Sequence, residues 1–152
     1  MVMDIREIQE HQQNRFPYLL IDRITEIVPG QRVKGYKNLT MNEWFFPSHF
    51  LGDPIMPGML MAEALAQTFI MTFLTLPEYK GQVTNFLRAD NVTFKARVVP
   101  GDRLEIEAEL KSFRRGIAKG SAEGRVDGHL ACRADFLIGL PRIIEQYTPR
   151  TA

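Results

Sequence analysis

An apolar segment of 18 residues, 59–76, constrains the fold of this chain more than any other feature of its sequence. It contains no basic residue, and its polar side chains include Glu63 and Gln67, which lie one helical turn apart. Pro57 lies just before the segment, near a first helical turn where a missing N–H costs nothing, and Pro77 ends it. A helix that is apolar on most of its sides has to be buried, so the rest of the chain must wrap around it.

A membrane-spanning helix is the alternative for this segment, because about 20 apolar residues cross a bilayer. Glu63 and Gln67 interrupt the apolar run, and no Lys- or Arg-rich loop flanks it to set an orientation. The whole chain has 152 residues, of which 45% are hydrophobic and 24% are charged, and these values are typical of a globular domain. We therefore predict a single domain over residues 1–152, with the helix in its core and no membrane partner.

The segments around this helix show the patterns of β-strands. Residues 16–28 are rich in β-branched and apolar side chains and end at a Pro-Gly turn, and residues 31–40 are a plausible partner strand. Residues 102–110 alternate apolar and charged side chains, which indicates a half-buried strand. Further strands are predicted at 83–94, 116–126 and 129–138, the last two joined by an Asp-Gly hairpin turn. The predicted class is α+β, with an antiparallel sheet of about six strands covering one long helix.

Charge and cysteine content exclude several kinds of protein. Lys and Arg together number 19 and Asp and Glu 18, so the chain lacks the strongly basic balance of a nucleic-acid-binding protein. Cys132 is the only cysteine, which excludes an internal disulfide and a cysteine-based zinc site. No secretory leader opens the chain, so we expect a cytoplasmic protein.

The side chains best suited to catalysis lie between positions 48 and 67. His49 lies in a loop rich in proline and glycine, and a histidine is a candidate general base. Glu63 lies on an apolar helix, where desolvation should raise its pKa and let it act as a general acid. Gln67 is placed to orient Glu63, and the Gly58 N–H at the helix start is suited to bind a developing oxyanion. This combination suits removal of a proton next to a carbonyl group.

Each of these residues also has a structural interpretation. A single loop histidine is more often solvated or stabilises a turn. Glu63 is also consistent with a solvent-facing stripe, or with an ion pair to Arg88 or Arg97. Taken together, and with Pro57 and Gly58 directly before the helix, His49 and Glu63 support a catalytic role and a purely structural role about equally.

Two further patterns have weak functional interpretations. A Ser-His-Asp site from Ser48, His49 and Asp53 is disfavoured, because adjacent side chains rarely face each other and no nucleophile-elbow motif is present. A basic run is most simply a solvated turn, with a dock for an acidic partner as the alternative; it comprises Lys111, Arg114, Arg115 and Lys119.

These motifs together resemble the 3-hydroxyacyl-(acyl-carrier-protein) dehydratases of the FabZ/FabA hot-dog superfamily. The resemblance covers roughly residues 15–135 and keeps the family's order, through 15–24, 37–43, the His49 loop, the Glu63 helix, 94–104 and 126–132. It implies the hot-dog fold, in which a bent antiparallel sheet wraps one long central helix. The chain departs from the usual FabZ pattern at Asn14, Ser48 and Leu51, where histidine, glycine and proline are usual.

The resemblance implies a specific reaction, the dehydration of (3R)-3-hydroxyacyl-[acyl-carrier-protein] to trans-2-enoyl-[acyl-carrier-protein] in fatty acid or related polyketide or polyene biosynthesis. It implies that His49 takes the C2 proton and that Glu63 assists departure of the C3 hydroxyl as water. The Gly58 amide would polarise the thioester carbonyl, and Gln67 would support Glu63. An apolar tunnel would hold the acyl chain; the residues expected to line it are Phe50, Met56 and Met59.

The same resemblance implies partners and assembly. The site would lie at a homodimer interface, with the histidine and the carboxylate from different subunits, and dimers would gather into trimers of dimers. Acyl carrier protein would dock through basic surface near the tunnel mouth. No metal or organic cofactor is implied beyond the phosphopantetheine arm of that carrier. Two other functions stay open, namely a hot-dog acyl thioesterase and a non-catalytic module that binds acyl groups or carrier protein.

Overall fold

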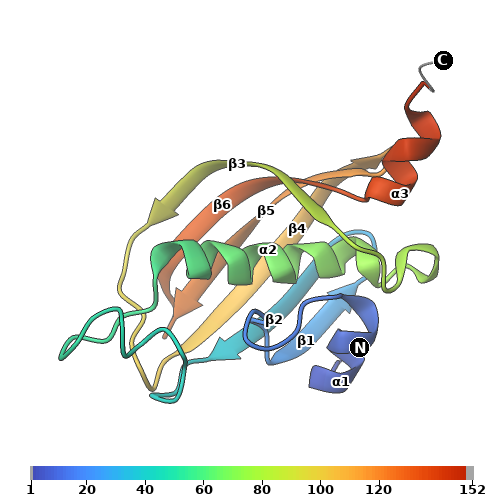
Figure 1. The fold of residues 1–152 in the computed structure, drawn as a ribbon. Helices are drawn as coiled ribbons and strands as arrows, with labels where there is room; N and C mark the ends of the chain where they lie inside the picture. Colours follow the sequence, from blue (N-terminus) through green and yellow to red (C-terminus); the bar gives the residue numbers. More distant parts are fainter. Residues whose placement is uncertain (1, 150–152) are drawn as a thin grey trace.

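A six-stranded antiparallel sheet curves around one long helix, as Figure 1 shows. The computed structural model describes residues 2–149. The strands lie in the order β1-β2-β4-β5-β6-β3. Along the chain the elements are α1 (Ile5–His11), β1 (Arg23–Val28), β2 (Arg32–Asn38), α2 (Gly58–Leu74), β3 (Asn85–Phe94), β4 (Arg103–Arg114), β5 (Ile117–Val126), β6 (His129–Gly139) and α3 (Pro141–Ile144), with single 3₁₀ turns at Pro77–Tyr79 and Glu145–Tyr147.

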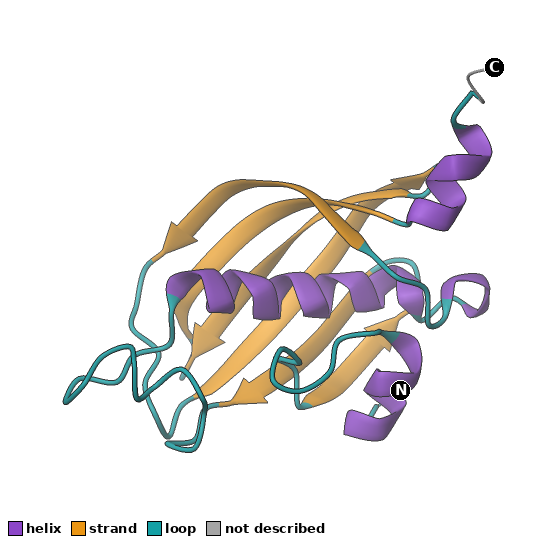
Figure 2. Ribbon diagram, viewed as in Figure 1, coloured by secondary structure: helices purple, strands orange, loops and turns teal. Residues whose placement is uncertain are grey.

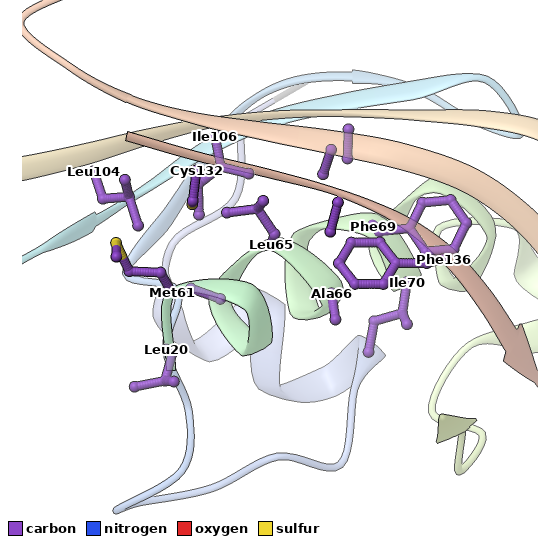
Figure 3. Packing of buried hydrophobic residues seen from close by; sticks show 14 of the residues in the cluster. Leu20, Met61, Leu65, Ala66, Phe69, Ile70, Leu104, Ile106, Cys132 and Phe136 are labelled. Atoms are coloured by element: carbon purple, nitrogen blue, oxygen red, sulfur yellow. The ribbon is translucent and has the colours of Figure 1, made fainter. Parts of the chain in front are cut away.

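The core lies between α2 and the concave face of the sheet. Apart from Glu63, every α2 residue from Met61 to Leu74 is buried. On β4, the buried residues Leu104, Ile106 and Ala108 alternate with exposed glutamates, as period-two patterning requires. Figure 3 shows Leu104 and Ile106 on the side of the sheet that faces the helix. One face of β4 therefore covers the apolar helix, while its other face exposes charged side chains to solvent.

Small residues on β5 let the helix lie close to the sheet. A Cβ atom at Gly120 would overlap the Glu109 carbonyl oxygen and the Phe69 ring. One at Gly124 would lie 3.1 Å from a Leu65 methyl group and 2.9 Å from Leu104. Glycine at these two positions therefore makes room for the large side chains of α2.

The predicted class and architecture are confirmed, with six strands, one long central helix and a hairpin turn at Asp127-Gly128 between β5 and β6. The strand predicted from residue 16 is wrong in its first part, since β1 begins only at Arg23. The helix ends at Leu74, two residues before the predicted end, and Pro77 opens a 3₁₀ turn instead of stopping the helix directly. The short helix α3 was not predicted.

The sheet has two edges, β1 and β3, which Figure 2 shows on opposite sides of α2. The first seven residues of β3 are all exposed, including Phe86 and Leu87, each about half exposed. β3 is thus a long, partly apolar edge strand with one side unpaired in the single chain. Within residues 2–149, no helix is long and apolar enough to cross a membrane.

Candidate active site

His49 is presented by the loop between β2 and α2. Turns with proline and glycine fill this loop, as the sequence predicts, and no regular element forms between Asn38 and Gly58. Phe45 and Phe46, each 1% exposed, anchor it in the core. The loop is therefore a fixed platform for His49 rather than a free surface segment.

The hydrogen bonds of His49 fix its tautomer. Nδ1 lies 3.0 Å from the Ile55 carbonyl oxygen, and the Ile55 N–H donates to the His49 carbonyl at 2.8 Å. A carbonyl oxygen only accepts, so Nδ1 carries the proton in this bond. In the neutral ring Nε2 then keeps its free lone pair, which is the state a general base requires.

His49 lines a cleft of about 410 Å³ at the start of α2. Gly58 is the first residue of that helix and also lines the cleft, with the Phe94 ring packed so closely that a Cβ at Gly58 would lie 3.1 Å from it. Leu60 and Met61 donate their N–H groups to the Pro57 carbonyl, and no side chain caps the helix. The Gly58 N–H is not used in these bonds and lies at the positive end of the helix dipole.

Glu63 lies one turn further along α2, mostly buried. Burial raises the pKa of its carboxyl group, and the hydrogen bond from Gln67 lowers it by less than burial raises it. Gln67 Nε2 donates to Glu63 Oε1 at 2.8 Å. Because Oε1 accepts that bond, the proton of the neutral acid is carried on Oε2, the oxygen left to donate.

Gln67 itself is held by the segment that precedes β1. Its Oε1 accepts the Leu20 N–H at 2.7 Å, and its Nε2 also donates to the Tyr18 carbonyl at 2.7 Å. These two bonds determine which end of the amide faces Glu63. The Tyr18 carbonyl and the Leu20 N–H thus pair with a helix side chain instead of a neighbouring strand, although the Asp22 N–H already donates to the Tyr36 carbonyl of β2.

His49 and Glu63 do not line a common cleft in one chain. Glu63 is absent from the residues that line the His49 cleft, and no hydrogen bond between the two side chains occurs among residues 2–149. Neither arginine suggested as a partner for Glu63 contacts it, because Arg97 pairs with Asp53 and Arg88 with Asp90. The ion-pair interpretation of Glu63 is therefore wrong.

The other predicted residues occupy different environments. Met56 is buried and lines the cleft, whereas Phe50 and Met59 do not line it and are 53% and 70% exposed. The Ser-His-Asp alternative has no supporting contact, since Ser48 Oγ donates to the Phe45 carbonyl and Asp53 pairs with Arg97. Within residues 2–149, no group of three or more His, Cys, Asp or Glu side chains is placed to hold a metal ion.

Sequence reasoning did not place three side chains beside these groups. Lys95 and Arg97 both line the His49 cleft and make its rim basic. Burial and the negative charge of Glu63 raise the pKa of the Tyr18 phenol, which places that phenol in the electrostatic range of Glu63. The spacing of Lys95 and Arg97 two residues apart, directly after β3, was the available signal for the basic rim.

A larger hollow of about 840 Å³ lies over the other face of the sheet. Its walls include Glu105, Glu107 and Glu109, the exposed residues of β4 that point away from α2. Lys34 pairs with Glu107 across this face at 3.5 Å. None of the candidate residues lines this hollow, so the His49 cleft is the better candidate site.

Comparison with known proteins identifies similar sequences over most of the chain. A family model described as FabA-like domain matches residues 13–135. The chain is 45% identical over 139 residues to a 3-hydroxyacyl-[acyl-carrier-protein] dehydratase FabZ of Roseiflexus castenholzii, covering 91% of this chain and 97% of the relative. It is 42% identical to a FabZ of the same description from Bacillus licheniformis, over 91% of this chain and 96% of that protein.

Solved structures share the fold at much lower identity. The dehydratase heterocomplex ApeI:P from Xenorhabdus doucetiae matches with a TM-score of 0.75 at 12% identity, over 93% of this chain and 97% of that one. A hypothetical thioesterase from Streptococcus pneumoniae, solved with coenzyme A, matches with a TM-score of 0.57 at 14% identity, over 77% and 83% of the two chains. These likenesses concern the fold alone, which hosts more than one activity.

Proposed function

The chain belongs to the FabA-like domain family, and from that premise we propose which of its residues carry out the family's reaction. It is a 3-hydroxyacyl-[acyl-carrier-protein] dehydratase, an enzyme of fatty acid biosynthesis that acts on acyl-carrier-protein substrates. In our proposal His49 is the general base, Glu63 the general acid and the Gly58 N–H the oxyanion donor. Gln67 is the residue that positions Glu63.

The arrangement around Glu63 is the observation that carries this assignment. A buried carboxyl whose pKa is raised by desolvation, with one oxygen engaged by Gln67, is suited to carry a proton and to donate it from Oε2. His49 supplies the complementary group, because its Nδ1–H bond to Ile55 leaves Nε2 free to accept a proton. A thioesterase that directs water at the carbonyl has no comparable need for a protonated acid.

The reaction then follows in balanced steps. His49 Nε2 takes the proton from C2 of the 3-hydroxyacyl thioester, and the electron pair of that C–H bond becomes the C2–C3 double bond. The C3–O bond breaks, and the leaving hydroxyl takes the proton of Glu63 and departs as water. The Gly58 N–H stabilises negative charge that develops on the thioester oxygen. Base, acid and oxyanion donor account for every proton and charge, so we propose no metal or organic cofactor beyond the carrier's pantetheine arm.

We propose that the complete site forms between two copies of the chain. In one chain Glu63 does not line the His49 cleft, and β3 has an unpaired side that carries Phe86 and Leu87. Pairing β3 with β3 of a second copy would cover that edge and make one continuous sheet. Phe50 and Met59, exposed in the single chain, would then line the acyl tunnel with Met56. Trimers of such dimers and a cytoplasmic location stay predictions.

Acyl carrier protein is the partner in this reaction, since the substrate is bound to it. Lys95 lies at the rim of the cleft beside the Arg97–Asp53 ion pair, and its positive charge at the mouth is suited to an acidic carrier. The separate basic run near Arg114 and Arg115 is exposed and lies at the turn between β4 and β5. The carrier could dock on the cleft rim or on this basic run, and the cleft rim is the surface nearer to His49.

Mass spectrometry of the reaction separates the candidate functions. Purified protein is incubated with a 3-hydroxyacyl-carrier-protein thioester, and the intact carrier is weighed. Loss of one water from the intact thioester, absent with His49→Ala, is the expected result. Release of the free acid would instead identify an acyl thioesterase. Binding of the carrier without a change in mass, across several acyl chains, would identify a non-catalytic module.

A further inference from the structure

Lys37, at the end of β2, is a buried lysine with a complete set of acceptors. Lys37 is only 6% exposed. A lysine this deeply buried almost always has partners for its charge. Nζ donates to Asp22 Oδ2 at 3.2 Å, to the Asn38 carbonyl at 2.9 Å and to Glu43 Oε1 at 2.8 Å. An ammonium group has three N–H donors, so each finds one acceptor.

These contacts join three separate parts of the chain. Asp22 precedes β1, Lys37 lies in β2, and Glu43 lies in the loop that carries His49. Asp22 Oδ2 also accepts the Asn38 N–H at 2.6 Å, which fixes the carboxylate from a second direction. Buried ion pairs add little net stability, because desolvation offsets the attraction, but they tolerate only one geometry. The cluster is therefore better suited to hold a position than to stabilise the fold.

A run of backbone hydrogen bonds connects Glu43 to His49. The Phe46 N–H donates to the Glu43 carbonyl at 3.3 Å, and the His49 N–H donates to the Phe46 carbonyl at 3.4 Å. Two consecutive turns thus span the residues between the Lys37 contact and the proposed base. A shift of Glu43 would therefore reach His49 through these backbone bonds, in addition to the anchoring of the loop by the buried Phe46 ring.

The other end of the His49 loop is held separately. Ile55 bonds to His49 through its backbone, and the Met56 N–H donates to the carbonyl of Val98, in the connection between β3 and β4, at 2.8 Å. The loop is therefore clamped at two ends, by Lys37 upstream and by Val98 downstream. Without the upstream clamp, Glu43 loses its contact with β2, and we expect the segment from Glu43 to His49 to shift.

We propose that Lys37 is a positioning residue for His49, acting through Glu43 and the two turns that follow it. This inference rests on the proposed role of His49 as general base. A misplacement of about 1 Å costs on the order of a hundredfold in rate when a reacting group must be aligned. Loss of Lys37 should therefore lower kcat while leaving KM nearly unchanged, since no contact of Lys37 reaches the cleft.

The test combines kinetics with nitrogen NMR of the histidine rings. Lys37→Met replaces the ammonium by an apolar group of similar length, and Glu43→Ala removes the same contact from the loop side. Lys34→Met is the matched control, because Lys34 lies on the same strand and also pairs with two carboxylates, Glu26 and Glu107, but on the outer face. The three histidines give separate signals, so His11 and His129 report on any general change.

We expect kcat to fall about tenfold or more in Lys37→Met and Glu43→Ala, with KM within about twofold of the original value. The His49 ring should lose its fixed Nδ1–H tautomer in both variants, while the signals of His11 and His129 and all properties of Lys34→Met stay unchanged. Glu43→Gln keeps an acceptor for Lys37 and should retain most of the activity. If Lys37→Met does not fold, Glu43→Ala and Glu43→Gln decide the question.

Unchanged His49 signals in folded Lys37→Met or Glu43→Ala would overturn the proposal, whether or not kcat falls. A loss of activity in Lys34→Met equal to that in Lys37→Met would also overturn it. If the original protein shows no dehydration at all, the proposed function fails instead. The tautomer of His49 still tests the positioning in that case, because the NMR measurement needs no substrate.

Discussion

The pKa and the orientation of Glu63 depend on the residues packed around it. The sequence predicts a carboxyl on an apolar helix with a raised pKa, and burial gives that direction in the structure. The sequence also predicts Gln67 as its partner, because residues i and i+4 share a helix face. It could not predict that the backbone of Tyr18 and Leu20 orients Gln67, since those contacts span more than 45 residues of sequence.

Loss of either proposed catalytic group should reduce turnover strongly. His49→Ala removes the base and Glu63→Gln removes the acid, so each should lower kcat by about two orders of magnitude. Steady-state kinetics on a 3-hydroxyacyl-carrier-protein thioester measure the effect, with Ser48→Ala as a control beside His49. Retention of full activity by both variants would remove the assignment of these residues.

The titration of Glu63 should make stability depend on pH in a defined direction. Burial raises the pKa of Glu63 in the folded protein above its ordinary value. At pH values between the ordinary and the raised pKa, the folded protein therefore keeps a proton on Glu63 that the unfolded chain has released. The contribution of the neutral carboxyl is therefore complete below the ordinary pKa and is lost as pH rises through the raised pKa.

Glu63→Gln keeps an acceptor for Gln67 but does not titrate. Its free energy of unfolding, relative to that of the original protein, should therefore increase as pH rises through this window. Urea denaturation at a series of pH values measures the difference. A difference that stays constant from acid to neutral pH would show that Glu63 is not desolvated.

At the scale of elements, α2 was the most predictable part of the fold. Its apolar sequence predicts a buried helix, and turn residues predict the hairpin between β5 and β6. The pairing of β2 with β4 and of β3 with β6 was not predicted, because period-two patterns define strands but not their neighbours in a sheet. The cleft was equally unpredictable, since β3 brings Phe94 beside Gly58 from far along the chain.

The contact between α2 and β5 should be sensitive to a single methyl group. Gly120→Ala places a Cβ against the Phe69 ring and the Glu109 carbonyl oxygen, and overpacking of this kind costs about 1–3 kcal/mol. Ser121→Ala, at the next residue on the opposite face, should change the free energy of unfolding little. Chemical denaturation of the two variants measures both values, and equal stabilities would contradict the close packing of α2 on β5.

At the scale of the whole molecule, the exposed edge at β3 is the feature that one chain leaves incomplete. Composition predicts one globular domain over residues 1–152 but says nothing about which edge of a sheet stays open. The resemblance to the dehydratase family supplied the expectation of a dimer, and our proposal places its interface at β3 because Phe86 and Leu87 are exposed there. The domain prediction itself stays a prediction.

A charge in the middle of β3 should separate the two copies. Ala89 is exposed in the single chain, so Ala89→Glu should leave the fold intact while placing like charges at the shared edge. Light scattering after gel filtration should show a monomer, and kcat should fall because no complete site forms. Thr25→Glu on β1, the other edge strand, is the control and should remain dimeric. A dimeric, active Ala89→Glu protein would place the interface elsewhere.

The central claim is that His49 of one copy and Glu63 of a second copy form one dehydratase site. Mixing two inactive variants tests it most directly: His49→Ala and Glu63→Gln are unfolded together in equal amounts, refolded and assayed for dehydration. Half of the dimers then contain one copy of each variant, and each of these has one intact site. The account predicts recovery of roughly a quarter of the original activity. No recovery from a mixture shown to contain mixed dimers would contradict it.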